Sequence, residues 1–253
     1  MSELHPTSRF SDRAGQYSLY RPEYPQAIIP FLEETIGLTP DTRIADVGSG
    51  TGIFSKLLLE AGYNVTSVEP NDKMREKAEA ALAGYSGYRS VGGTAEETTL
   101  ADHSVDLVTV AQAFHWFRPA ETRREFERIL RRPGHVLLVW NIQQSDNPFL
   151  EAYTELKETY SEKIVHGHRA NLERIQEIFD PFRVTTRNFR QSQQLDAEGL
   201  KGHLLSFSTV PMAGDARYPE MMRELDRIFA QYNRQGLVDV EYETKTYLVH
   251  LDR

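Results

Sequence analysis

Three glycines give the segment DVGSGTG (residues 46–52) unusual backbone freedom. Gly48, Gly50 and Gly52 tolerate positive φ angles and leave room for a ligand to approach the main chain. The segment follows an apolar stretch, 44–47, and precedes apolar residues at helical spacing, so it predicts a turn from a strand into a helix. Such a helix directs its unbonded N–H groups and its positive dipole end at the loop. The pattern therefore indicates a ligand held by the backbone.

Two carboxylates narrow the kind of ligand. Asp46, inside the glycine segment, disfavours a pyrophosphate and suits an ammonium or sulfonium group. Glu69 ends the next predicted strand, 23 residues later, where a carboxylate can accept hydrogen bonds from both hydroxyls of a ribose. The glycine spacing is G-x-G-x-G, whereas dinucleotide enzymes favour G-x-G-x-x-G. These features predict a nucleoside with a cationic end and no essential phosphate, a description that S-adenosylmethionine (SAM) meets.

Predicted strands and helices, which must position these residues, alternate along the first half of the chain. Apolar periodicity predicts strands at 44–47, 65–69, 88–92, 105–111 and 135–140, and helices at 26–36, 53–61, 72–83 and before Pro133-Gly134. Alternation predicts parallel strands, hence an open, doubly wound α/β sheet with helices on both faces. Ligands of such sheets bind beyond the carboxyl ends of the strands, where the glycine segment, Glu69, Gln112 and Asn141 fall.

The pattern of apolar residues changes in the second half of the chain. Helical stripes at 149–160, 172–179, 197–207 and 219–232 surround predicted strands at 182–195 and 238–250. We expect these two strands, one of them antiparallel, to extend the sheet to seven, with the helices between them forming a cap over the ligand face. The prediction is one domain over 1–253. It comprises an N-terminal arm and helix (1–37), a cofactor-binding core (38–141), a helical cap with one inserted strand (142–237) and a C-terminal strand (238–253).

Composition excludes several classes of protein. The chain has 253 residues, a net charge of −8 and no cysteine, which argues against a dedicated nucleic-acid binder and excludes disulfides, thiolate zinc sites and thiol nucleophiles. His166 and His168 lack a nearby carboxylate, so no metal site is predicted. No apolar run is long enough for a membrane span, and the N-terminus lacks a signal-peptide pattern. We expect a cytoplasmic monomer or homodimer without nucleic-acid or membrane partners.

At this point the chain resembles a known family. The glycine segment is similar to motif I of the class I, Rossmann-like SAM-dependent methyltransferases, and the likeness extends over most of 40–141. The segment VEPN (68–71) resembles the ribose motif, and GTAE (93–96) resembles the segment that binds adenine. The resemblance implies SAM as cofactor, S-adenosylhomocysteine (SAH) as product, and cofactor contacts from Asp46, Gly48, Ser49, Gly50, Gly52, Glu69, Pro70, Met74, Thr94, Ala95 and Glu96. Many relatives carry Asp where Thr94 stands, so Glu96 or backbone groups would have to bind the adenine amine.

Two further segments suggest the acceptor. YSLYRPEYP (17–25) and AQAFHWF (111–117) look like the trans-aconitate-methyltransferase-like group within the type 11 methyltransferases, which implies a small-molecule acceptor, often a carboxylic acid. We expect the arm to fold over the cofactor, with Tyr20 beside it and Arg21 pairing with a carboxylate of cofactor or acceptor; a merely packed arm is the alternative. Gln112 is expected to orient acceptor or cofactor. His115 is a candidate general base, or a wall of the site.

Two other functions stay open from the sequence. A SAM-binding regulator or partner subunit would bind the cofactor without turnover. An NAD-linked oxidoreductase would share the fold, but the glycine spacing and Asp46 speak against it.

Overall fold

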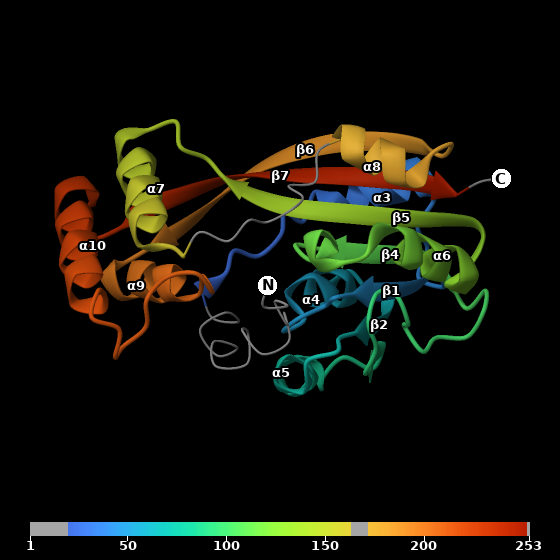
Figure 1. Cartoon of the computed structure of the whole chain (residues 1–253). Coiled ribbons are helices and arrows are strands. Elements are labelled where there is room, and N and C mark those ends of the chain that lie inside the picture. Colours follow the sequence, from blue (N-terminus) through green and yellow to red (C-terminus); the bar gives the residue numbers. More distant parts are fainter. Residues whose placement is uncertain (1–19, 163–171, 252–253) are drawn as a thin grey trace.

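The computed structural model describes residues 20–162 and 172–251, so Tyr17, His166 and His168 lie outside the described residues. A seven-stranded sheet organises the molecule, in the order β3-β2-β1-β4-β5-β7-β6 (Figure 1). The strands are β1 (Arg43–Val47), β2 (Asn64–Val68), β3 (Tyr88–Val91), β4 (Val105–Ala111), β5 (Leu130–Gln143), β6 (Arg183–Leu195) and β7 (Val238–Leu251). Strands β1 to β5 pair in parallel, and β7 runs antiparallel to both β5 and β6. The prediction of a doubly wound sheet with one antiparallel strand is confirmed.

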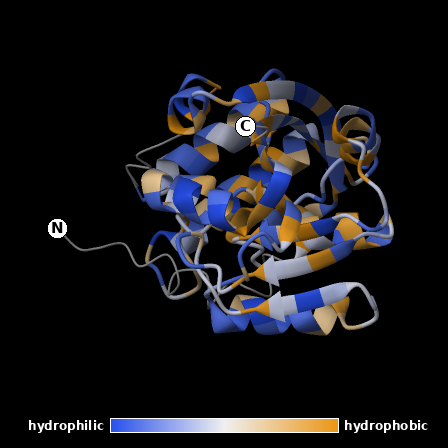
Figure 2. Cartoon of the chain, turned by 90° about the vertical axis from the view of Figure 1, so that its right-hand side faces the viewer, coloured by the Kyte–Doolittle hydropathy of each residue, from blue (hydrophilic) through white to orange (hydrophobic). Residues whose placement is uncertain are grey.

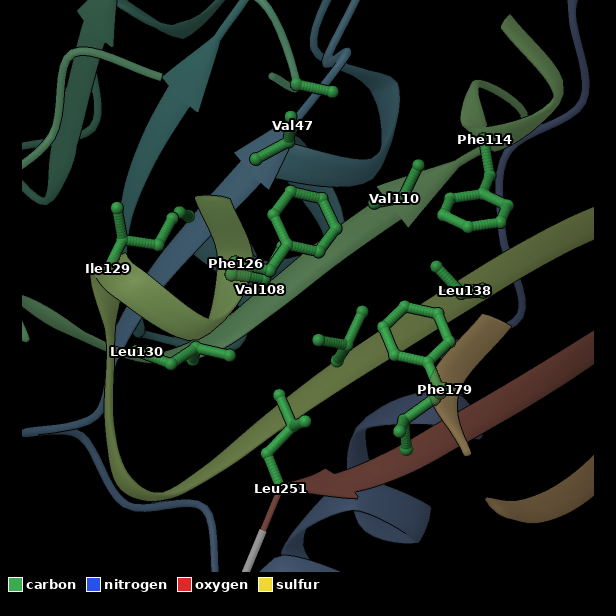
Figure 3. Close-up of a cluster of buried hydrophobic side chains, with 14 of the residues drawn as sticks. Val47, Val108, Val110, Phe114, Phe126, Ile129, Leu130, Leu138, Phe179 and Leu251 are labelled. Carbon is green, nitrogen blue, oxygen red and sulfur yellow. The ribbon is translucent and has the colours of Figure 1, made fainter. Parts of the chain in front are cut away.

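Helices cover both faces of the sheet. They are α3 (Ile28–Ile36), α4 (Ile53–Glu60), α5 (Asp72–Leu82), α6 (Pro119–Ile129), α7 (Pro148–Tyr160), α8 (Leu172–Phe179), α9 (Ala197–Leu205) and α10 (Tyr218–Tyr232). Side chains of α3 and α4 pack against one face. Those of α6 and α8 pack against the other, where Phe126 and Phe179 lie over Val108, Val110 and Leu138 (Figure 3). Neighbouring β4 residues alternate between these two cores, as the two-residue repeat of a strand requires.

Local chemistry sets the element boundaries near the loops. Asn71 caps α5, since its side-chain oxygen accepts a hydrogen bond from the Met74 N–H at 3.1 Å. The boundary expected at Pro133-Gly134 is wrong. The preceding helix ends earlier, at Ile129, and β5 begins directly at Leu130. The strand therefore spans 14 residues and passes through the proline and glycine.

Three helices form the cap: α7, α9 and α10. They share a third apolar cluster, built on Tyr153, Leu204 and Met221, with the nearby ends of β6 and β7. Figure 1 shows them grouped at one end of the sheet, beyond the tip of the β5 arrow. Coloured by hydropathy, helices around the sheet carry both hydrophilic and hydrophobic residues (Figure 2). The expectation that every helix of 142–237 belongs to the cap needs one correction, because Ile175 and Phe179 place α8 on the sheet.

The two last strands connect the cap with the sheet. β6 and β7 pair without interruption from Arg183 opposite His250 to Leu195 opposite Val238. Leu195 and Val238 belong to the cap cluster, whereas Val249 belongs to the sheet core. One hydrogen-bonded ribbon therefore runs through both parts. Within the described segments, no helix combines the length and apolar character that a membrane crossing requires.

Candidate functional site

Each glycine of the loop between β1 and α4 has a separate structural reason. All three adopt positive φ angles, of 69°, 57° and 82°. A Cβ on Gly48 would lie 2.7 Å from the Ala113 Cβ, and one on Gly52 would lie 2.7 Å from Leu82. A Cβ on Gly50 would meet nothing within 4 Å. Gly48 and Gly52 thus allow close packing, and Gly50 faces open space at the tip of the loop.

Glu69 follows β2 and is tied to this loop. Its two carboxylate oxygens each accept one backbone N–H, from Gly50 and from Asn71, both at 2.9 Å. Burial raises the pKa of Glu69, and these two hydrogen bonds act in the opposite direction. Each oxygen retains lone-pair capacity for a hydroxyl donor. The arrangement holds a carboxylate in a fixed orientation next to the exposed side of Gly50.

Asp46 lies underneath the loop and not at its surface. The side chain is fully buried, and its two oxygens accept hydrogen bonds from Ser55 at 2.6 Å and from Thr109 at 2.9 Å. Burial raises the pKa of Asp46 to about 6, despite both bonds. This burial does not fit the expected direct contact between Asp46 and a ligand, because both carboxylate oxygens are bound by side chains beneath the loop. Ser55 and Thr109 are supporting residues that the sequence analysis did not identify.

Two hydroxyls in the loop are buried and unsatisfied. Ser49 Oγ and Thr51 Oγ1 have no hydrogen-bond partner among the described residues. Buried hydroxyls without a partner are costly in a folded protein and point to a missing ligand or solvent atom. Together with the open side of Gly50, they fit a polar ligand that completes this loop.

The segment after β3 forms a tight turn. Thr94 and Glu97 exchange backbone hydrogen bonds at 3.0 and 3.3 Å, and Thr94 Oγ1 also accepts the Glu97 N–H. Ala95 is buried. Glu96 Oε1 accepts the Arg118 N–H at 2.8 Å, which ties the turn to the start of α6. One of the two carboxylate oxygens of Glu96 is thus already bound by the protein itself. Of the other predicted contacts, Met74 is buried in α5 and Pro70 is exposed.

The end of β4 is strained. Gln112 has a φ of 57°, a conformation unusual for any residue with a side chain. Its side-chain amide donates to the Asn141 carbonyl at 3.0 Å, and thus links the ends of β4 and β5. His115 follows in a short 3-10 helix, half-buried, with its ring 4.9 Å from that of Trp116. Strain of this kind is typical of functional sites.

The N-terminal arm lies against the cap. The Tyr20 ring packs onto Gly202 of α9, and the Tyr20 carbonyl accepts from the Gln193 amide at 3.2 Å. Arg21 donates to the Ser206 carbonyl at 3.2 Å and lies 4.1 Å from the centre of the Phe207 ring. The structure thus brings Tyr20 and Arg21 together with α9, an element absent from their predicted environment.

Comparison with known proteins agrees with this geometry. Residues 45–138 match the model of a methyltransferase domain family. Residues 45–138 therefore carry a methyltransferase domain, and the strand order gives it the class I, Rossmann-like fold. An uncharacterized methyltransferase of Mycobacterium tuberculosis is 40% identical over 134 residues, which are 52% of this chain and 51% of that protein. This chain therefore spans about half the length of the mycobacterial relative.

Solved structures share the fold of this methyltransferase domain. A structure from Anaeromyxobacter dehalogenans, assigned as a type II methyltransferase, has a TM-score of 0.70 at 20% identity and covers 92% of this chain and 98% of its own. Phosphoethanolamine N-methyltransferase 2 of Haemonchus contortus, solved with SAM, has a TM-score of 0.57 at 14% identity, covering 95% and 57%. The Glu69 carboxylate and the two unsatisfied loop hydroxyls of this chain fit SAM, the ligand in that structure. Among described residues, no group of three acidic or histidine side chains is placed to hold a metal.

Some residues of the methyltransferase domain and its cap had no sequence signal. Lys157 of α7 and His203 of α9 lie inside the cap, near Arg21. Tyr153 and Tyr160 of α7 were predicted to belong to the cap core, and both are buried. Lys157 lies in the same helix among other charged residues, so its charge alone gave no signal. Their position near Arg21 depends on the tertiary contact between the arm and the cap, which the sequence does not show.

Proposed function

We propose that this chain transfers a methyl group from SAM to a small-molecule acceptor, with a carboxylic acid as the favoured acceptor class. The observation that carries the proposal is the Glu69 carboxylate, fixed by the N–H groups of Gly50 and Asn71 beside the open side of the glycine loop. That position suits the two hydroxyls of a ribose. The buried charge of Asp46 suits the cationic end of the same ligand.

The chain's own residues would align and enclose the reactants. Bound SAM supplies a methyl group on a cationic sulfur, and its transfer needs an in-line approach and exclusion of water more than a strong catalytic group. Gln112 would orient the acceptor at the ends of β4 and β5. A carboxylate acceptor is already ionised at neutral pH and needs no base. His115 would take the proton if the acceptor were a hydroxyl.

The acceptor class draws support from the sequence likeness of 17–25 and 111–117 to the trans-aconitate-methyltransferase-like group, and from Arg21 in the cap. Cytoplasmic placement and a monomeric or homodimeric state belong to the same proposal.

A metabolite screen tests the function. Purified protein is incubated with a cell extract and SAM that carries a labelled methyl group, and products are identified by mass. We expect SAH and one labelled small molecule. Binding of SAM without a labelled product would instead favour a regulator or partner subunit, and binding of NAD in place of SAM would favour an oxidoreductase.

A further inference from the structure

Two cations from distant parts of the sequence meet inside the cap. The Arg21 guanidinium carbon lies 4.1 Å from the centre of the Phe207 ring, and the Lys157 ammonium lies 4.8 Å from the same centre. Arg21 belongs to the arm, Lys157 to α7, and Phe207 follows α9. Three separate segments are therefore arranged so that two positive charges share one aromatic ring.

Lys157 has only neutral direct partners. Its ammonium donates to Gln143 Oε1 at 2.5 Å and lies 4.9 Å from the centre of the Tyr153 ring. Across residues 20–162 and 172–251, no carboxylate lies within ion-pair distance of this ammonium. Burial, and next the charge of Arg21, lower the pKa of Lys157 to about 7, and the exposed Glu158 opposes this shift only in part.

Three other titratable side chains in the described part of the cap, those of Tyr153, His203 and Tyr242, carry no negative charge near pH 7. His203 is fully buried, with its two ring nitrogens 2.8 Å from the hydroxyls of Tyr153 and Tyr242. Burial lowers the pKa of His203 and raises the pKa values of both tyrosines, so all three are neutral near pH 7. The cluster thus combines two cations with a neutral, hydrogen-bonded base.

We infer that Arg21 and Lys157 together bind an anionic group of the acceptor, and that Lys157 determines specificity for acceptors that carry one. The inference rests on the proposed function, and it assigns recognition of the acceptor's negative charge to these two residues. The charge of Arg21 acts unfavourably on the Lys157 ammonium, and an anion in contact with both cations would offset this effect. Arg21 supplies a planar donor and Lys157 a point charge, a combination suited to a carboxylate.

The cluster is connected to the edge of the sheet. Gln143, the partner of Lys157, ends β5 two residues after Asn141. The Asn141 carbonyl accepts from Gln112 at the end of β4. Lys157 is therefore tied through Gln143 to the same end of β5 that Gln112 contacts, and this is the end of the sheet at which ligands of such folds bind.

The experiment uses the full chain saturated with SAH, with succinate as the anionic probe and succinamide as its uncharged analogue. Affinity is measured by calorimetry, and the titration of the Lys157 ammonium is followed by NMR. We expect succinate, and not succinamide, to bind and to move the Lys157 titration to higher pH. Lys157→Gln should weaken succinate binding at least tenfold. Lys157→Arg, which keeps the charge, should retain binding within about threefold.

Lys201→Gln, the same change on α9, is the matched control and should leave succinate binding unchanged. Equal binding of succinate by Lys157→Gln and the natural protein would overturn the inference, as would equal binding of succinamide. Unchanged succinate binding in Lys157→Gln, together with lost methyl transfer in Lys157→Arg, would assign Lys157 as a base instead. If SAH does not bind, the proposed function is wrong. If SAH binds and Lys157→Gln transfers methyl groups at the rate of the natural protein, only this inference is wrong.

Discussion

The ring of Tyr20 occupies the space that a side chain on Gly202 would need. A Cβ built on Gly202 lies 2.3 Å from the nearest ring carbon, far inside any real contact. A glycine on α9 thus creates the seat for the aromatic side chain that precedes Arg21. This packing contact holds the arm against the cap together with the hydrogen bonds from Gln193 to Tyr20 and from Arg21 to Ser206.

Gly202→Ala should therefore displace the arm. We expect methyl transfer to fall by about 10- to 100-fold, because a small misplacement of positioning groups has effects of that size. Affinity for SAH, measured by calorimetry, should change less than twofold. Gly199→Ala, in the same helix but away from Tyr20, is the control. Full activity of Gly202→Ala would mean that the arm is not needed in this position.

Glu69→Gln should weaken cofactor binding. The substitution keeps an acceptor for one backbone N–H but removes the charge that binds the ribose hydroxyls. A hydrogen bond to a charged group contributes about 1.5–3 kcal/mol, so we expect SAH affinity to fall by about 10- to 150-fold in calorimetry. Glu76→Gln, an exposed position on α5, is the matched control. An affinity within twofold of the natural protein would show that Glu69 does not bind the ribose.

Gly48→Ala and Gly50→Ala should separate packing from ligand access. Both place a side chain at positive φ, which costs about 1–2 kcal/mol. Gly48→Ala also forces overlap with Ala113 and Phe117, and overpacking costs a further 1–3 kcal/mol, roughly. Urea unfolding should rank Gly48→Ala as the less stable. Gly50→Ala should keep most of its stability and lose SAH affinity; equal stabilities of the two variants would contradict the packing argument.

Cofactor binding should depend on the charge of Asp46. Without ligand its pKa is raised to about 6, and a nearby sulfonium favours the ionised form. Affinity for SAM should therefore rise as the pH increases towards 6 and level off above it. SAH lacks the sulfonium charge and should show a smaller change. Calorimetry between pH 5 and 8 measures the ratio of the two affinities.

Asp46→Asn should make that ratio independent of pH, and a constant ratio in the natural protein would place the cofactor's charge away from Asp46. The raised pKa of Asp46 also makes the stability of the folded protein depend on pH. Because the folded protein holds the Asp46 proton more tightly than the unfolded chain, ionisation lowers the free energy of unfolding as the pH rises from about 4 to 6.

The order of strands and helices was predictable because each element repeats a strong local pattern. The limits of β4 match the prediction, and Asn71 caps α5 as expected. Errors arose where tertiary contacts overrode local signals. Leu130 already pairs with β4, and pairing with β7 begins at Gly134, so β5 continues on both sides of the unpaired residues 131–133. Packing against the sheet takes α8 out of the cap.

The cofactor loop was predictable to a similar extent, since glycines and carboxylates carry a local signature. The depth of Asp46 was not, because burial depends on Ser55 and Thr109, which come from other elements. The cap cluster was invisible for the same reason. Nothing in the sequence near Lys157 indicates that Arg21, 136 positions away, lies against the same ring.

The uninterrupted pairing of β6 with β7 has a mechanical consequence. A lid that opens as a rigid unit needs a flexible hinge, and here the connection is a ladder of backbone hydrogen bonds. Swinging the helices α7, α9 and α10 away from the sheet would break that ladder. We therefore expect entry of the proposed acceptor to depend on release of Tyr20 and Arg21, whose described contacts with the cap each involve a side chain.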